Sequence, residues 1–421
     1  MNSEKIRVYQ LTNGNYGFVN FDNCRRVEIT PTEKDIYDQM ASEKTTNIEG
    51  GRQLVTKMIK SGIYSKCEIN PELVPSREQR QTVHLYVTDN CNYHCKYCYA
   101  DAAPHAPNEA ALTYENGKMI IDAIAVCGFK EVVFTGGEPF LCNVLFKLAS
   151  YARRKFLVVG LLTNGYYVTE ETARKCQCFH YVKLSLDGSE ARYHDPMRGS
   201  GSFDQTVKAI KRLQNYHIKL EIGSVITKIN MSNISDLLTF ISKDLQIDMH
   251  SLVQYSGGKR RIHAQMECSC DEILKINEEI FTYKIDRLSG MKNATQRPEF
   301  FLPSTPAPHC GMGITEILID YYGDVYPCRM SRYETFRMGN IMNDGLETIL
   351  TDFFKADLVK RISVDSLTQC MKCDYKYLCS GGCRMHHAGI TGSIEKTDGF
   401  TCDILRTQID NKLSWTYYYT N

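Results

Sequence analysis

The sequence carries almost no net charge, a single tryptophan and no long hydrophobic run. Its 421 residues contain 50 Lys and Arg against 49 Asp and Glu, which gives a formal charge of +1. A basic groove for nucleic acid or a basic face for anionic lipid is therefore disfavoured. The opening residues lack the apolar core of a signal peptide, and no stretch of about 18 apolar residues occurs. We expect a cytoplasmic protein that has no nucleic-acid partner and no membrane partner.

Cysteine, in contrast, is abundant, with 18 residues in the chain. In a reducing compartment, clustered cysteines are more often metal ligands or redox groups than disulfides. The hydrophobic share of 43% is large enough to build real cores, and a chain of this length is expected to hold two or three domains. The spacing of the cysteines should therefore indicate which chemistry the chain performs.

The first part of the chain, residues 1–70, combines strand-like runs with two helical patterns. Thr30 begins a capping-box pattern with Pro31 at the first helical position, which predicts the start of a helix. A second helical pattern stops at Gly62. The expected strands cover residues 6–10, 16–19 and 25–29. This order predicts a small winged-helix-like module, followed by a linker over residues 71–82.

Strand-like and helix-like runs alternate over residues 83–290. The expected strands are 84–88, 131–136, 156–163, 181–187, 220–227 and 249–255, and helical patterns include 118–126, 203–214 and 234–243. Six such units with Val-, Leu- and Ile-rich strands predict an α/β fold, a partial (β/α)6 TIM-like barrel with a parallel sheet. Ligand chemistry then belongs at the carboxyl ends of the strands.

Three cysteines follow the first of these strands in a compact loop. Cys91, Cys95 and Cys98 have the spacing C-x3-C-x2-C. Three thiolates can hold three corners of an iron–sulfur cubane and leave one iron open for a substrate or cofactor. A zinc site would need a fourth ligand, which His94 could supply. Three thiols without any ligand are the third interpretation.

The cysteine loop and four later motifs together resemble the radical S-adenosylmethionine (SAM) superfamily. Tyr97 supplies the aromatic residue before the third cysteine. The later motifs are Thr135-Gly136-Gly137-Glu138-Pro139, Thr163-Asn164-Gly165, Ser185-Leu186-Asp187-Gly188 and His194-Asp195-Pro196-Met197-Arg198. Each single motif would be an ordinary turn, but four of them at or just after successive strand ends make coincidence improbable.

The resemblance implies roles for these residues. Cys91, Cys95 and Cys98 would be the catalytic and metal-binding thiolates of a [4Fe–4S] cluster that binds SAM. Reductive cleavage of SAM would then allow removal of a hydrogen atom from an unactivated C–H bond, and the electron would come from a reductant such as flavodoxin or ferredoxin. The expected contacts of SAM are Tyr97, Gly136, Gly137, Glu138, Pro139, Thr163, Asn164, Ser185, Asp187 and Arg198.

A second group of cysteines follows a Pro-rich connection. Its members are Cys310, Cys328, Cys370, Cys373, Cys379, Cys383 and Cys402. Two pairs at metal-ligand spacing also allow a zinc-ribbon-like site. With Gly323 between the first two cysteines, the pattern resembles the iron–sulfur-binding SPASM domain, which would occupy residues 291–421 at the C-terminus.

The SPASM resemblance implies two auxiliary [4Fe–4S] clusters, and therefore three clusters in the chain. The outer cluster would be held by Cys370, Cys373, Cys379 and Cys402, and the inner one by Cys310, Cys328 and Cys383. Fully ligated members add a cysteine shortly before the position of Cys310, where this chain has none. Either the inner cluster has an open iron, or Cys268 or Cys270 supplies the ligand.

The expected substrate is a ribosomally made precursor peptide. SPASM enzymes mostly act on peptides or proteins, and many bear a module like residues 1–70 that binds a leader segment by strand addition. The alternative for this module is a small folded cap on the barrel. We expect the reaction to install a crosslink, with a thioether ahead of a carbon–carbon bond, because an auxiliary cluster suits a net oxidation.

Three other functions remain open at this point. A peptide epimerase would need a free cysteine as hydrogen donor. An anaerobic sulfatase-maturing enzyme carries an Asp after the cysteine equivalent to Cys328, where this chain has Arg329. An iron–sulfur electron-transfer protein would explain the late cysteines, but it leaves the loop with Cys91, Cys95 and Cys98 unexplained.

Overall fold

The computed structural model describes residues 5–65, 78, 80–104, 112–254, 266–289, 306–355 and 358–414. The chain folds into two compact units. We call Leu73–Ile280 with Gly311–Leu358 the barrel unit, and Met1–Glu72 with Phe281–Cys310 and Val359–Asn421 the terminal unit. These units group the residues differently from the predicted domains, whose boundaries stay a prediction.

Six parallel strands form the centre of the barrel unit and pair in chain order. They are β4 (Thr82–Tyr86), β5 (Glu131–Thr135), β6 (Val158–Thr163), β7 (Tyr181–Ser185), β8 (Leu220–Ile226) and β9 (Met249–Gln254). All six predicted strands are present. β4 starts two residues earlier than predicted, at the last residue of the predicted linker. The α/β partial barrel is confirmed.

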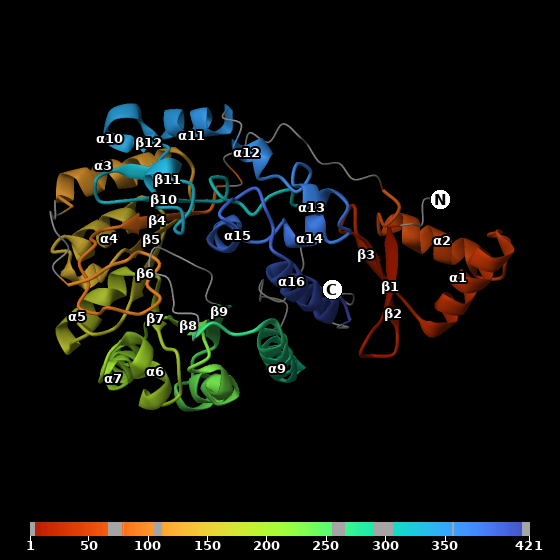
Figure 1. Ribbon diagram of the computed structural model, residues 1–421, viewed down its shortest axis with the longest axis horizontal. Helices are drawn as coiled ribbons and strands as arrows, with labels where there is room; N and C mark the ends of the chain where they lie inside the picture. The colour runs from red at the N-terminus through yellow and green to blue at the C-terminus, as the bar shows by residue number, and fades with distance from the viewer. Residues whose placement is uncertain are drawn as a thin grey trace. The chain divides into compact units, whose positions relative to one another are not determined.

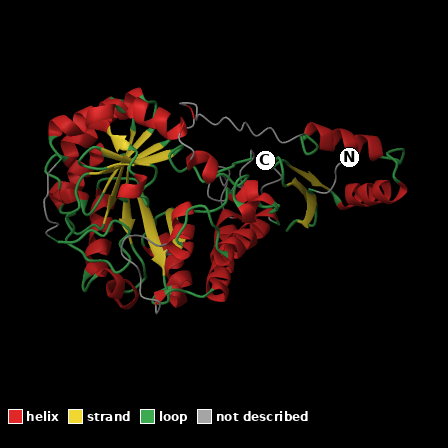
Figure 2. Cartoon of the chain, turned by 45° about the horizontal axis from the view of Figure 1, so that its top comes forward, coloured by secondary structure: helices red, strands yellow, loops and turns green. Residues whose placement is uncertain are grey.

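Helices between the strands cover the outside of the sheet (Figure 2). They are α3 (Tyr114–Val126), α4 (Leu145–Arg154), α5 (Glu170–Lys175), α6 (Ala191–Arg198), α7 (Ser202–Asn215) and α8 (Ile234–Thr239), and α9 (Cys270–Ser289) follows β9. The predicted helix over 234–243 continues past α8 as a π-helical turn, Phe240–Asp244.

Buried and partly accessible side chains alternate along the strands of the barrel. In β8, Leu220, Ile222 and Ile226 are buried, whereas Glu221 and Val225 between them are partly accessible. Successive side chains of a strand point to opposite faces, so the apolar set packs under the helices and the other set faces the interior. The strands therefore present their carboxyl ends and one polar face for chemistry.

Three further strands extend this sheet beyond β4, and the sequence did not predict them. β10 (Glu316–Ile319) pairs parallel with β4, β11 (Asp324–Tyr326) pairs antiparallel with β10, and β12 (Gly339–Asn340) completes the edge. α10 (Ile341–Asp344) and α11 (Leu346–Lys355) follow. Most of the Pro-rich connection before β10 lies outside the described residues.

The terminal unit begins with an antiparallel sheet and two helices. The sheet has the order β1 (Ile6–Gln10), β2 (Tyr16–Asn20), β3 (Arg26–Ile29), and α1 (Pro31–Glu43) and α2 (Gly51–Lys60) follow. The predicted capping box is confirmed, because the Thr30 hydroxyl accepts from the Glu33 amide and the Glu33 carboxylate accepts from the Thr30 amide. The winged-helix assignment stays a prediction.

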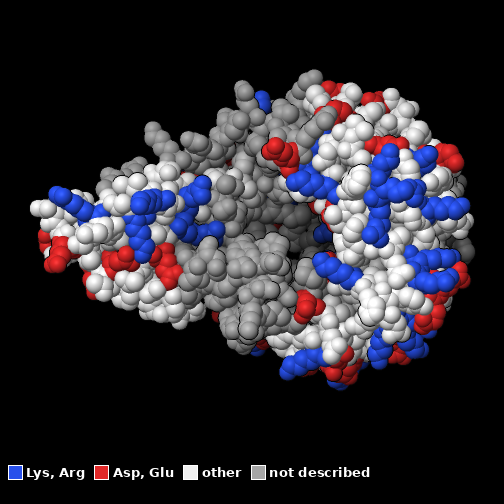
Figure 3. All heavy atoms as spheres, turned by 180° about the vertical axis from the view of Figure 1, so that it is seen from behind, with Lys and Arg blue, Asp and Glu red and all other residues white. Residues whose placement is uncertain are grey.

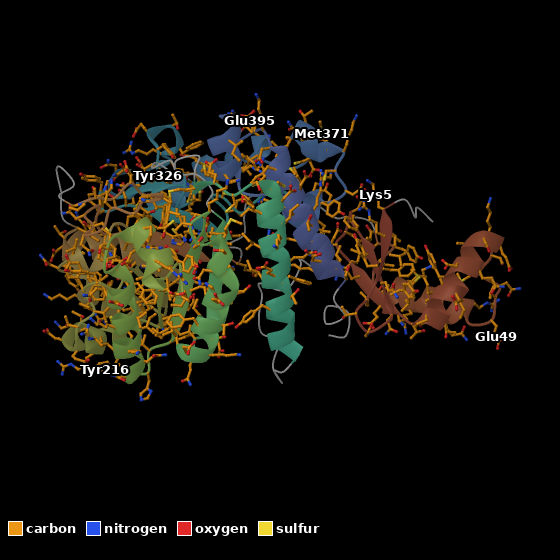
Figure 4. All side chains as sticks on the ribbon, turned by 60° about the horizontal axis from the view of Figure 1, so that its bottom comes forward. Lys5, Glu49, Tyr216, Tyr326, Met371 and Glu395 are labelled. Carbon is orange, nitrogen blue, oxygen red and sulfur yellow. The ribbon has the colours of Figure 1, made fainter. Side chains whose placement is uncertain are left out.

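This N-terminal sheet shares its core with the last part of the chain (Figure 1). That part contains α12 (Leu358–Arg361), α13 (Thr368–Met371), α14 (Lys376–Cys379), α15 (Arg384–Thr391) and α16 (Gly399–Leu413). Phe21 is buried with Leu378 and Leu413, and its ring contacts Tyr375 edge-on at 5.1 Å. Lys5, labelled in Figure 4, forms an ion pair of 2.7 Å with Asp374. Residues 5–29 are therefore an integral part of the terminal unit.

Candidate active site

The loop of Cys91, Cys95 and Cys98 lies directly after the carboxyl end of β4. Cys91 is buried, and the other two thiols are half-buried. The Tyr93 amide lies 3.4 Å from the Cys91 sulfur, so the backbone turns around this thiol. Burial raises the pKa of Cys91 to about 12, and the Glu138 carboxylate and the other two thiols add to this effect. Three thiols within electrostatic reach of one another favour a cationic group between them.

The turn after β5 is bound to the cysteine loop through its backbone. The Gly137 amide donates to the Thr88 carbonyl at 2.7 Å, and the Glu138 amide donates to the Asn90 carbonyl at 2.8 Å. A Cβ on Gly137 would lie 2.1 Å from the Asn90 carbonyl oxygen. Only glycine therefore allows the two loops to come so close.

Glu138 connects the end of β5 to the end of β6. Its carboxylate is fully buried and accepts from the Thr163 hydroxyl at 2.8 Å, from the Asn164 amide at 2.9 Å and from the Phe140 amide at 3.2 Å. Burial raises its pKa to about 7, and the three donors oppose that rise. Protein donors thus engage both carboxylate oxygens, so Glu138 holds the turn in place, and Pro139 starts the short helix that follows.

Asn164 reaches from the end of β6 back to the cysteine loop. Its side-chain amide donates to Asn92 Oδ1 at 2.9 Å and lies 3.8 Å from the Cys91 sulfur. The sequence pointed to Asn164 through its motif but not to Asn92. The identity of the residue after Cys91 carries no spacing signal, so only the fold could reveal this contact.

Asp187, Arg198 and Tyr97 form a buried network at the end of β7. Arg198 Nε donates to Asp187 Oδ2 at 2.6 Å, and the Tyr97 hydroxyl donates to the same oxygen. Arg198 Nη1 lies 4.0 Å from the Cys95 sulfur, and its guanidinium stands over the Tyr97 ring. Burial alone would raise the pKa of Asp187, but the Arg198 charge overrides it and the pKa lies below its usual value. The network therefore ties the cysteine loop to β7.

His194 supports this network from behind. Its Nδ1 accepts from the Asp187 amide at 3.0 Å. Burial lowers the pKa of His194 to about 4, although the Asp187 charge opposes this effect. The imidazole is therefore neutral at pH 7 and acts as an acceptor. Ser185, the remaining predicted contact of SAM on this strand, ends β7 in register with Gly223 of β8.

A further ion pair, which the sequence did not predict, connects the end of β4 to the β10–β11 turn. Arg332 pairs with Asp89 and lies 3.2 Å from the Asp320 carboxylate. The Tyr321 hydroxyl also donates to Asp89 at 3.0 Å. Because β10 and β11 were not expected, no sequence signal placed these side chains beside the cysteine loop.

Four of the late cysteines gather in the terminal unit. The charges that act on the Cys379 thiol include those of Cys370, Cys373 and Cys402, and burial is the main cause of its raised pKa. This set matches the predicted outer ligands. Of the predicted inner ligands, Cys310 and Cys383 are exposed in the terminal unit, and Cys328 is buried in the barrel unit. Both auxiliary ligand sets stay predictions.

The donors that gather suit iron–sulfur chemistry. Among the described residues, no three His, Cys, Asp or Glu side chains are arranged to hold a single metal ion. The predicted sets of three and of four thiols are the donor sets that cubane clusters take. Cys268, two residues before α9, is half-buried near the charges of Glu272 and Lys228, and Cys270, the first residue of α9, is also half-buried.

In the part of the chain that the structure describes, no helix is long and apolar enough to cross a bilayer. On the face shown in Figure 3, many Lys and Arg side chains lie over the middle of the larger lobe, and Asp and Glu lie mostly toward its edge.

Comparison with protein families identifies two domains. The profile of the radical SAM superfamily matches residues 85–242, and the profile of an iron–sulfur cluster-binding domain, SPASM, matches residues 310–374. The chain therefore carries a radical SAM domain. It carries a SPASM domain after the barrel, so both resemblances seen in the sequence are confirmed.

The curated relatives include two maturation or biosynthesis proteins and a heme synthase. The mycofactocin maturase MftC of Mycolicibacterium smegmatis is 27% identical over 308 residues, which cover 70% of this chain and 76% of MftC. The antilisterial bacteriocin subtilosin biosynthesis protein AlbA of Bacillus subtilis is 27% identical over 311 residues, which cover 70% of this chain and 65% of AlbA. An AdoMet-dependent heme synthase of Nitratidesulfovibrio vulgaris is 24% identical over 330 residues, which cover 73% of this chain and 88% of the synthase.

Solved structures share the fold. The structure of anSMEcpe with bound AdoMet has a TM-score of 0.63 and 19% identity, and the match covers 79% of this chain and 96% of that chain. The structure of Streptococcus suis SuiB bound to S-adenosylmethionine has a TM-score of 0.60 and 19% identity, with 94% and 99% covered. The likeness to SuiB extends over nearly the whole chain.

Proposed function

We propose that this enzyme is a peptide maturase that removes a hydrogen atom from a ribosomally made precursor peptide and installs a crosslink. A thioether is favoured over a carbon–carbon bond. The cofactors would be SAM and three [4Fe–4S] clusters, one held by Cys91, Cys95 and Cys98 and two by the late cysteines. A flavodoxin or ferredoxin would supply the electron, and we place the reaction in the cytoplasm.

Relatives of this kind support a peptide substrate. The name of MftC describes a maturase, and one structure of SuiB contains the precursor peptide SuiA. The match to that SuiB structure covers 94% of this chain with a TM-score of 0.59. A crosslink is favoured over epimerisation because crosslink formation is a net oxidation of the peptide. The auxiliary clusters that the late cysteines would hold could accept the electron that this oxidation releases.

The residues of the active site have clear duties in this reaction. When bound, the cluster and SAM supply the one-electron chemistry that attacks an unactivated C–H bond. The network of Tyr97, Asp187 and Arg198 holds the cysteine loop in place. Gly137 allows the turn after β5 to pack closely against that loop. Tyr97, Asp187 and Arg198 are buried, and the low local dielectric strengthens the ion pair and hydrogen bond among them.

The interior face of the barrel is polar. Lys183 of β7 lies in register with Glu221 of β8, and burial lowers its pKa against the Glu221 charge. His84 Nε2 of β4 lies 3.6 Å from the Glu316 carboxylate. A mixed set of charged side chains suits a peptide with polar groups.

Arg329 speaks against sulfatase maturation. A base is needed at the position after Cys328, and a guanidinium cannot take a proton because it stays charged at any working pH. In this chain the positive charge of Arg329 lies among Tyr86, Tyr99 and Glu316. The residue is therefore better suited to hold a substrate anion than to abstract a proton.

The observation that carries the proposal is the N-terminal sheet with its two edge strands, β1 and β3. An extended leader segment can add to such an edge through main-chain hydrogen bonds. Hydrogen–deuterium exchange with the precursor peptide tests this, because strand addition protects the outward amides of β1 or β3. Protection found only in the barrel unit would remove the assigned role of the sheet.

Deletion of residues 1–70 would not test the peptide-binding role of the N-terminal sheet cleanly. Val19 and Phe21 share a core with Leu367 and Leu413 of the terminal unit. Removing the sheet would expose this apolar surface, so lost peptide binding could not be separated from damage to the auxiliary region. Exchange measurements on the intact chain avoid that confusion.

A further inference from the structure

Arg384 is a buried cation that has no anionic partner in the described part of the chain. It is 0% exposed and heads the set of largest fully buried side chains. Its Nε and Nη2 atoms have no hydrogen-bond partner, and Nη1 makes one long contact of 3.5 Å with the Ile394 carbonyl. Burying a charge in this state is costly, as is burying donors that stay unsatisfied.

The position of Arg384 in the backbone adds to this cost. It is the first residue of α15, and Cys383 is the residue that caps the helix. The amino end of a helix carries a partial positive charge, so a cation is unfavourable there. A Cβ on Gly381 would lie 3.3 Å from Arg384 Nη2, which shows that the guanidinium packs closely against this turn.

The carboxylate of Asp398 is engaged by other groups. Asp398 lies 2.5 Å from His387 Nδ1 and accepts from the Thr401 amide at 2.7 Å. Burial lowers the pKa of His387, and the Arg384 charge contributes to this shift. The positive charge of Arg384 thus disfavours the protonated form of His387. His387 carries no negative charge, so it cannot balance the charge of the Arg384 guanidinium.

The outer cysteine set lies close to the turn against which Arg384 packs. A Cβ on Gly381 would lie 3.0 Å from Val364 Cγ1 as well as 3.3 Å from Arg384 Nη2, and Val364 is buried in one cluster with Cys370, against which Cys379 packs. Four thiolates around a [4Fe–4S] cluster leave a net negative charge, and one more negative charge is added when the cluster is reduced. Net charge and hydrogen bonds at the sulfurs are among the factors that set the reduction potential of such a cluster.

We propose that Arg384 is the buried counter-charge of the outer auxiliary cluster and that it raises the reduction potential of that cluster. The inference rests on the proposed function, since it needs the outer cluster held by Cys370, Cys373, Cys379 and Cys402. Arg384 is a positioning and tuning residue that is distinct from the ligands. Its charge makes the outer cluster a better electron acceptor.

Arg406 provides a matched control. Its Nη2 lies 3.7 Å from the Cys373 sulfur, so it is also a guanidinium beside an outer ligand. Its side chain, however, is 44% exposed, and solvent screens an exposed charge far more than a buried one. Removing the Arg406 charge should therefore change the potential much less than removing the Arg384 charge.

The experiment is a redox titration followed by electron paramagnetic resonance. The full-length chain is purified without oxygen in a background in which Cys91, Cys95 and Cys98 are Ala, so that only auxiliary clusters give signals. Cys373→Ala identifies the outer signal by its loss. Arg384→Met, Arg384→Lys and Arg406→Met are then compared, with iron content measured for each.

Arg384→Met should lower the midpoint potential so that the ratio of reduced to oxidised outer cluster falls at least tenfold at a fixed potential, about 59 mV for one electron. Arg384→Lys should retain most of the wild-type value, and Arg406→Met should shift it by less than half as much as Arg384→Met. An Arg384→Met shift no larger than that of Arg406→Met would overturn the inference.

Loss of the cluster is also informative. If Arg384→Met loses the outer iron while Arg384→Lys keeps it, the charge is required and the inference stands. If both variants lose the iron, Arg384 acts through packing and the inference is wrong. If Cys373→Ala leaves the iron content unchanged, the outer cluster of the proposed function fails, whatever Arg384 does.

Discussion

At the scale of single residues, the Asp187 carboxylate depends on one cation. It is fully buried and receives donors from Arg198, Tyr97 and the Val225 amide. Removing one partner of a buried ion pair leaves an uncompensated charge, which costs far more than the pair itself contributes.

Arg198→Met should therefore lower the free energy of unfolding by about 3–5 kcal/mol, as measured by urea denaturation followed by circular dichroism. The control is Arg192→Met on the same helix, because Arg192 pairs with Glu190 on the open surface. That variant should unfold like the wild type. Equal losses in both variants would show that the Asp187 network does not stabilise the barrel.

His194 gives the stability a pH dependence. Its folded pKa of about 4 lies below the unfolded value, so the unfolded chain binds an extra proton between the two values. The stability that neutral His194 provides is complete above about pH 6.5 and is lost as the pH falls toward 4. At about pH 5.5 the loss should be about 1 kcal/mol.

His194→Asn keeps an acceptor for the Asp187 amide and removes the titration. Urea denaturation at about pH 8 and pH 5.5 should show a smaller loss of stability on acidification for this variant than for the wild type. The same loss in both proteins would contradict the assignment of His194 as a buried neutral acceptor.

Sequence motifs predicted most of the side chains at this edge and missed their supports. Tyr97, Asp187 and Arg198 belong to motifs at strand ends, and the structure joins them in one network. Asn92 and the ion pair of Asp89 with Arg332 were not predicted, because their contacts depend on which loops lie next to each other in the fold. Arg332 follows β11, a strand too short to be recognised from a hydrophobic period.

At the scale of elements, the turn after β5 has to fit against the cysteine loop. An added Cβ at Gly137 would meet the Asn90 carbonyl oxygen at 2.1 Å, and backbone cannot move aside as a flexible side chain can. Gly137→Ala should displace the cysteine loop and lower the iron content by about four atoms per chain.

Gly399→Ala is the control for this steric effect, since nothing lies within 4 Å of a Cβ at Gly399. Iron analysis after anaerobic reconstitution should give the wild-type value for this variant. Unchanged iron in Gly137→Ala would mean that the cysteine loop does not depend on the close approach of the turn.

The contact between the N-terminal sheet and the end of the chain rests on Phe21. Arg7 stands over the Phe21 ring at 4.8 Å, and the Phe21 ring contacts the Tyr375 ring edge-on. Phe21→Ala should destabilise the terminal unit by about 3–5 kcal/mol and speed proteolysis within residues 5–29. Val8→Ala, at a side chain 40% exposed, should leave the cleavage rate unchanged; equal cleavage of both variants would contradict the shared core.

Helices and strands with a clear hydrophobic pattern could be predicted from the sequence, and those without such a pattern could not. The strands of the barrel and the Thr30 cap follow from patterns within short windows. β10 to β12 are two to four residues long, too short to show a period, and they form because β4 offers an edge to pair with. The contact of Phe21 with Tyr375 joins segments more than 350 residues apart in sequence, so no local pattern could predict it.

At the scale of the whole molecule, two cysteine groups belong to one enzyme. The radical SAM domain and the SPASM domain lie in one chain, and the N-terminal sheet packs with the late cysteines within the terminal unit. A leader bound at that sheet would therefore touch the same compact unit that holds the outer thiols. Ten of the 18 cysteines belong to the two predicted ligand groups.

The central claim is that this chain crosslinks a precursor peptide. The most direct measurement is anaerobic co-expression with the short peptide encoded beside the gene, followed by mass spectrometry of the peptide. The account predicts a product lighter by the mass of two hydrogen atoms, formed by the wild type and absent with Cys95→Ala. A peptide of unchanged mass from the iron-loaded wild-type enzyme would contradict it.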